Sequence, residues 1–240
     1  MKKTVLLALV ALLAGCASTG PVRQIADSSP LAILTVSANP EITWVNEESS
    51  SGGLLKAAAG KLINDAKSDT ASTLLSRTDL LVGRAEKLLR ATIAGAGFTV
   101  VDPAKIMQSG MYLSAKEDRM MAASGQVAPY GYRFISDRDT VLVQKLAAEN
   151  AFRAGLHVSF MFNKNMSSGV AKNGTAVAQV IMNVIMIDTA GKISLRKSYQ
   201  ASSEEKIPVI GGAYDPTKLM ALFPGVIDDV CGKFVADFTK

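Results

Sequence analysis

The segment from residue 156 to residue 201 constrains the fold most, because much of it alternates in polarity with a period of two. Apolar residues at 156, 158, 160 and 162 alternate with residues 157, 159, 161 and 163, which is the pattern of a half-buried strand. Residues 176–187 form the most strand-like run of the chain, and residues 193–201 form a more exposed strand. Residues 163–175, which include Asn173-Gly174, predict a long polar hairpin loop. We therefore expect a meander of three antiparallel strands.

Helical patterns surround this meander. Residues 31–36 predict a strand, and a helical pattern from Ser68 or Asp69 to Gly95 leads into a short buried strand at 98–101. Residues 105–123 predict a helix broken near Gly110. A further helix is expected from Ser136 or Asp137 to about residue 153, ended by Gly155 and with residues 141, 142, 146 and 147 inward. The last helix begins at Pro216, and Pro224 is expected to break or kink it.

These elements predict one α/β (α+β) domain over residues 31–240. It is expected to be a single three-layer-like domain with a mixed sheet, an antiparallel meander in the C-terminal half and helices packed on the sheet. With 48% apolar and 20% charged residues among 240, a packed core is expected. One histidine excludes a multi-histidine metal site, and two cysteines exclude a disulfide framework or a four-cysteine zinc site. We expect no metal and no cofactor.

The first twenty residues predict where the chain resides. Lys2 and Lys3 precede an uncharged apolar run at 5–14, which is typical of a signal peptide and too short to span a bilayer. The run ends in Leu13-Ala14-Gly15-Cys16, which resembles the lipobox of bacterial lipoproteins. That resemblance implies that Leu13, Ala14 and Gly15 are recognised by the signal peptidase, and that the thiol of Cys16 is lipidated.

Cleavage before Cys16 would remove residues 1–15 as a lipoprotein signal peptide and leave 16–30 as an acylated tether. Two lysines would leave with the peptide, so the formal charge would fall from +5 to +3. Several acyl chains on one N-terminus give stable anchoring. Ala17 and Ser18 follow the cysteine, and this resemblance to sorted lipoproteins favours the outer membrane, with the domain facing the periplasm.

Residues with catalytic potential form no recognisable set. His157 falls on the more polar face of its strand, and Cys231 lies in an apolar helical pattern, so both are interpreted as structural. Asp137, Asp139, Glu204 and Glu205 supply carboxylates, but there is no GxSxG motif. Gly60-Lys61 lacks the flanking residues of a phosphate loop. We expect neither an enzyme nor a nucleic-acid partner, and we interpret the arginines at 77, 84 and 90, with Lys87, as a solvated helix face.

The order of these pieces resembles one envelope architecture. The pieces are LAILTV (31–36), EKLLRATIAGAG running into FTVVDP (86–103), KLAAENAFRAG running into LHVSFMF (145–162), the hairpin VIMNVIMIDTAGKISLRKSY (180–199) and a closing helix. They are similar to the periplasmic domain shared by the curli secretion channel lipoprotein family, the amino-terminal domain of the Tol-Pal propeller protein and the lipoprotein activators of peptidoglycan synthases. These are binding or assembly proteins, so the resemblance implies no catalytic residue.

The leading hypothesis is a non-enzymatic, lipid-anchored periplasmic protein that binds an envelope protein partner and can form a homo-oligomer. A second hypothesis is a ring-forming secretion or pore component of the outer membrane, in which residues 47–66 insert into the membrane. A third is a periplasmic hydrolase, which would gain support if Asp137 or Asp139 lined a deep pocket facing His157.

Overall fold

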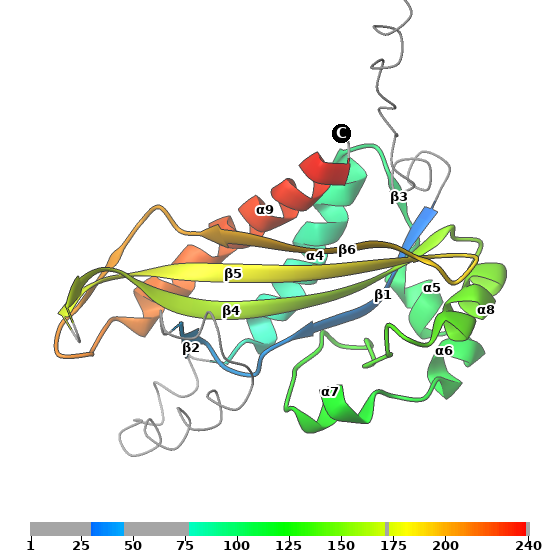
Figure 1. Ribbon diagram of the computed structural model, residues 1–240, viewed down its shortest axis with the longest axis horizontal. Coiled ribbons are helices and arrows are strands. Elements are labelled where there is room, and N and C mark those ends of the chain that lie inside the picture. Colours follow the sequence, from blue (N-terminus) through cyan, green and yellow to red (C-terminus); the bar gives the residue numbers. More distant parts are fainter. Residues whose placement is uncertain (1–29, 46–76, 171–172, 239–240) are drawn as a thin grey trace, which may run out of the picture.

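The computed structural model describes residues 30–45, 77–170 and 173–238. In this part of the chain one mixed sheet of seven strands is covered by helices on both faces (Figure 1). The main strand order is β3-β1-β4-β5-β6, while β2 pairs with β4 and β7 pairs with β5. The expected α/β class, the mixed sheet and the antiparallel C-terminal meander are therefore confirmed.

Strand β1 (Pro30–Ala38) lies inside the sheet because nearly all of its side chains are buried on both faces. It runs parallel to β3 (Thr99–Val100) on one side and to β4 (Ala154–Val170) on the other. Strand β2 (Thr43–Trp44) continues along β4 after the break at Pro40. Thr99 is exposed and Val100 is half-buried, so the expectation that residues 98–101 form a buried strand is wrong. These residues lie at the edge of the sheet.

The meander is longer than the sequence pattern predicts. β4 pairs antiparallel with β5 (Asn173–Asp188), and β5 pairs with β6 (Ile193–Ser202). The ladder between β4 and β5 continues to the pair Val170 and Asn173, so Asn173-Gly174 belongs to a strand. The predicted loop at 163–175 is therefore wrong over most of its length. Exposed strands satisfy their backbone groups by pairing, and polar side chains on both faces do not prevent it.

Helices α4 (Asp79–Gly95) and α9 (Pro216–Phe238) cover one face of the sheet. Their apolar stripes pack with the even-numbered residues of β4 and β5 in the larger core. The helix expected from residue 68 or 69 begins at Asp79 in the described part, and Arg77 forms an isolated bridge with Glu41 instead. Pro224 lies inside α9 and does not break it. The buried residues on both sides of Pro224 hold the helix together despite the missing backbone donor.

Four short helices follow β3: α5 (Pro103–Met107), α6 (Gly110–Ser114), α7 (Arg119–Ala123) and α8 (Thr140–Asn150). Residues of α5, α6 and α8 form a smaller core on the second face of the sheet. The break expected near Gly110 separates α5 from α6, and a second break, which was not expected, separates α6 from α7. Asp139, rather than Ser136 or Asp137, caps α8.

The remaining differences from the predictions concern where elements end and which side chains point inward. Helix α8 ends at Ala151, which has a left-handed φ of 57°, whereas Gly155 lies inside β4. Val141, expected to point inward, is exposed at one end of the same helix. Pro208 lies in the short strand β7 (Ile207–Val209).

Residues 1–29 and 46–76 lie outside the described residues. The predicted signal peptide, the lipobox with Cys16, the tether and the segment 47–66 all fall there. None of the described helices is long and apolar enough to cross a membrane.

Candidate functional site

A polar layer lies between the second face of the sheet and the chain segment that leads into α8. Thr35, His157, Ile185 and Arg196 are neighbours in register on β1, β4, β5 and β6. Residues 133–137, called the strap below, contact both ends of this row. Thr35 Oγ1 lies 3.4 Å from the Ile135 carbonyl oxygen and 3.4 Å from the Ile135 amide nitrogen. At the other end, Arg196 donates to the carboxylate of Asp137 over 2.8 Å.

His157 is buried in the middle of this row, with 6% of its surface exposed. Neither ring nitrogen has a hydrogen-bond partner. Burial lowers the pKa of His157 to about 4, and the opposing effects of the Asp137 carboxylate and the Ile135 backbone do not offset it. At neutral pH the ring is therefore uncharged, which suits a structural residue and not a proton shuttle.

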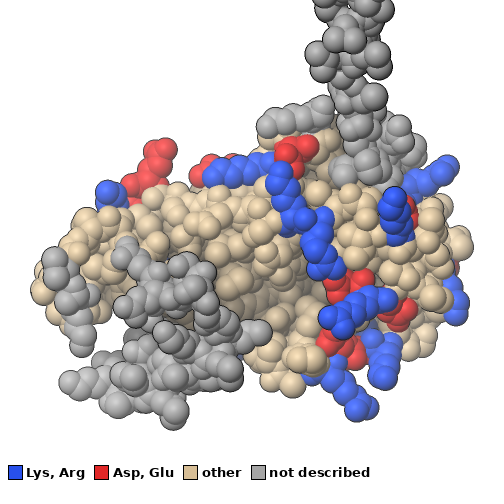
Figure 2. All heavy atoms as spheres, in the orientation of Figure 1, with Lys and Arg blue, Asp and Glu red and all other residues tan. Residues whose placement is uncertain are grey.

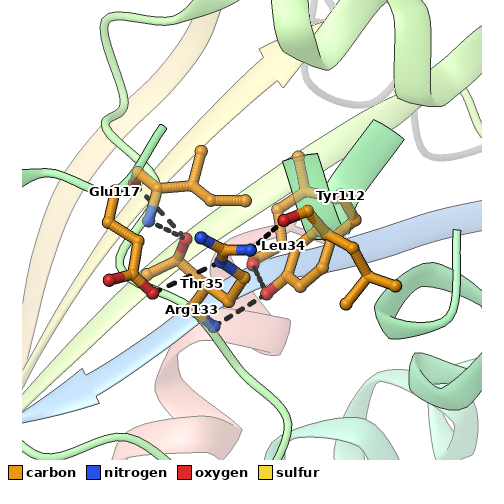
Figure 3. A network of polar contacts seen from close by, with 7 residues as sticks. Leu34, Thr35, Tyr112, Glu117 and Arg133 are labelled. Carbon is orange, nitrogen blue, oxygen red and sulfur yellow. Dashed lines mark hydrogen bonds and ion pairs between the residues drawn. The ribbon is translucent and has the colours of Figure 1, made fainter. Parts of the chain in front are cut away.

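The strap is attached to β1 by the network shown in Figure 3. The Tyr112 hydroxyl donates to the Leu34 carbonyl over 2.9 Å and accepts from the Arg133 amide over 2.9 Å. The Arg133 guanidinium donates to the Leu113 carbonyl and forms an ion pair with Glu117 over 3.3 Å. Burial of Tyr112 raises its pKa to about 12, so it remains a hydroxyl donor. The network thus connects both α6 and the strap to β1.

Residues 110–141, called the outer segment below, expose large apolar side chains. Tyr130 and Met120 are 103% and 83% exposed, and Leu113 is 56% exposed. Met111 and Val141 are exposed as well. The neighbouring Tyr132 behaves differently, because it is buried and donates to Glu86 over 3.0 Å. Of these two tyrosines, Tyr132 therefore packs inside the domain and Tyr130 projects into solvent.

Figure 2 shows the charges on this face of the molecule. Lys, Arg, Asp and Glu gather at the end occupied by α6 and α8, with both signs interspersed, while much of the middle of the face carries neither sign. Exposed apolar side chains beside mixed charges are typical of a surface that contacts another protein.

The carboxylates considered for a hydrolase have other partners or positions. Asp137 pairs with Arg196 and Asp139 accepts from the Leu142 amide, while Glu204 and Glu205 are exposed beyond β6. Asp139 lines a hollow of about 310 Å³ with Glu117, Asp118 and Met120, but His157 does not line it. Within the described ranges no three His, Cys, Asp or Glu side chains are placed to hold a metal ion.

A second hollow, of about 500 Å³, lies between α4 and the start of α5. Lys87 and Arg90 line it from α4, and Asp102 lines it from the cap of α5. The sequence pattern placed both cations on a solvated helix face, and no local signal indicated that Asp102 lines the same hollow.

Two further polar side chains, Lys164 and Cys231, are buried in surroundings that do not form a reactive site. Lys164 is buried at the far end of the larger core, where it donates to the Tyr214 hydroxyl over 2.7 Å and lies over the Trp44 ring. Cys231 is buried in α9, and burial raises its pKa to about 12. Its thiol is therefore unreactive at neutral pH.

The described part of the chain thus presents an exposed apolar segment fixed by a polar network, and two shallow hollows that no histidine lines. Comparison with known proteins adds no relative, since no family model and no curated protein matches the sequence.

Proposed function

We propose that this chain is a non-enzymatic, lipid-anchored binding protein of the bacterial cell envelope. Cys16 carries the acyl chains, the outer membrane holds the anchor, and the domain faces the periplasm. The outer segment docks a protein partner. The anchor part of the proposal is supported by the sequence Leu13-Ala14-Gly15-Cys16 and the apolar run before it.

One observation carries the binding part of the proposal. Five large apolar side chains are exposed within residues 111–141, although the segment also contributes Tyr112, Ala115 and Ile135 to the smaller core. Methionine and tyrosine are enriched where proteins contact one another. Since the Tyr112 network fixes the segment to β1, little conformational entropy is lost when a partner binds it.

The experiment places a photo-crosslinking amino acid at Met120 in cells that produce the acylated protein. The control carries the same amino acid at Ala190, which is exposed in the turn between β5 and β6. We expect one adduct of defined mass from position 120 and none from position 190. Adding Leu113→Ser should weaken the adduct, because the partner loses an apolar contact.

Equal adducts from both positions, or none from position 120, would contradict the proposal. Unfolding curves of the Leu113→Ser variant provide the folding control. Leu113 is more than half exposed, so its replacement should change the stability by less than about 0.5 kcal/mol.

A further inference from the structure

The hollow between α4 and α5 combines charges of both signs with an apolar lining. Lys87 is exposed and forms no ion pair with another described residue, whereas Arg90 is half-buried and pairs with the buried Glu86. Asp102 lines the same hollow, and the Ala104 amide donates to its Oδ1 over 3.0 Å. Ala91, Ala94 and Val100 supply part of the apolar lining.

This arrangement selects the charge type of a ligand. Lys87 and Arg90 favour an anionic group, and Asp102 favours a cationic group a short distance away from it. A purely anionic ligand would be repelled by Asp102. The lining therefore fits a zwitterion in which an amine and a phosphate are linked by a short chain.

The hollow lies where the chain enters the domain. Pro30 pairs with Thr99 and Leu31 pairs with Val100, which lines the hollow. From Cys16 to Pro30 the chain spans at most about 48 Å when fully extended. An anchored Cys16 therefore allows this end of the domain to reach the membrane surface. The tip of the β4–β5 hairpin lies at the other end of strands about 55 Å long.

We propose that this hollow binds the phosphoethanolamine headgroup of a phospholipid, as a second contact with the membrane that holds Cys16. Lys87 and Arg90 bind the phosphate, and Asp102 accepts hydrogen bonds from the primary ammonium. This inference rests on the proposed anchored function. The contact orients the domain on the bilayer, so that the outer segment faces a partner in a fixed direction.

The test uses the full mature chain with Cys16→Ser, so that acyl chains contribute nothing to binding. Co-sedimentation is measured with vesicles of phosphatidylcholine alone, and with phosphatidylcholine mixed with either phosphatidylethanolamine or phosphatidylglycerol. We expect the tightest binding to the phosphatidylethanolamine vesicles. The quaternary ammonium of phosphatidylcholine has no N–H to donate to Asp102.

Three variants separate the contributions. Lys87→Gln should weaken binding to phosphatidylethanolamine vesicles about fivefold. Arg84→Gln, which removes an exposed cation on the same helix outside the hollow, should leave it unchanged. Asp102→Asn preserves the helix cap, because asparagine caps as well as aspartate does. It should weaken binding to phosphatidylethanolamine and strengthen binding to phosphatidylglycerol.

The inference is overturned if Arg84→Gln weakens binding as much as Lys87→Gln, because the surface would then act only through its total charge. It is also overturned if Asp102→Asn changes neither the binding to phosphatidylethanolamine vesicles nor the binding to phosphatidylglycerol vesicles. Thermal stabilisation by inorganic phosphate equal to that by phosphatidylethanolamine vesicles would identify free phosphate as the ligand and contradict the headgroup assignment. Membrane fractionation of the acylated wild type tests the anchor separately, so failure of one proposal is distinguishable from failure of the other.

Discussion

His157 makes the stability of the domain depend on pH. Its pKa is about 4 when folded and 6.5 in the unfolded chain. Between these values the unfolded state binds a proton that the folded state does not, so the stability contributed by His157 is fully present above pH 6.5 and is lost as the pH decreases toward 4. We expect a loss of about 2 kcal/mol between pH 7 and pH 5, measured by urea unfolding at both values.

The matched variant is His157→Leu, which removes the titrating group and fills the same buried position. Its midpoints at pH 7 and pH 5 should lie closer together than those of the wild type. An unchanged difference between the two midpoints would show that other groups cause the pH dependence.

Among the non-glycine residues that the structure describes, Ala151 is the one with a positive φ, at 57°. The left-handed conformation costs an alanine about 1–2 kcal/mol, whereas glycine adopts it freely at the end of a helix. Ala151→Gly should therefore stabilise the protein by about 0.5–1 kcal/mol after the larger entropy of the unfolded chain is deducted. The result is read from the denaturation midpoint, and a lower midpoint would refute it.

At the scale of elements, one hydroxyl joins the outer segment to β1. Tyr112→Phe leaves the Leu34 carbonyl and the Arg133 amide without their partner, which should cost about 1–3 kcal/mol. Tyr130→Phe is the control, because its side chain is fully exposed. The two variants are compared by equilibrium unfolding, and equal midpoints would mean that water replaces the lost contacts.

Elements with strong local patterns were predictable from the sequence. The apolar run of β1 indicated a strand. The alternation in β4 also indicated a strand, because a polarity period of two does not fit a helix. The polar ends of β4 and β5 were not predictable, since Ser, Asn and Gly favour turns in isolation and pair only when a partner strand is present. The same reason explains Pro224, whose local cost is offset by packing of α9 on the sheet.

The candidate site was less predictable than the fold. Nothing local in the sequence distinguished the exposed Tyr130 from the buried Tyr132, whose partner Glu86 is 46 residues away. The contact between Asp137 and Arg196 spans 59 residues. Such contacts depend on the sheet order, which one sequence does not specify.

At the scale of the whole molecule, we expect the proposed anchor and the domain to be separable. Cys16→Ser should move the protein from the membrane fraction to the soluble periplasmic fraction, because burial of the acyl chains in the bilayer is lost. Fractionation followed by detection of the intact chain measures this. Persistence of the variant in membranes would mean that another part of the chain binds them strongly without acylation.

The parallel pairing of β1 with β4 also determines when an exported chain can fold. Leu31 lies beside Ala154, 123 positions further along the chain. A chain that crosses a membrane N-terminus first delivers β1 long before its neighbour in the sheet arrives. Loop closure over this distance slows folding, so under the proposed export β1 cannot pair with β4 until about two thirds of the chain has emerged.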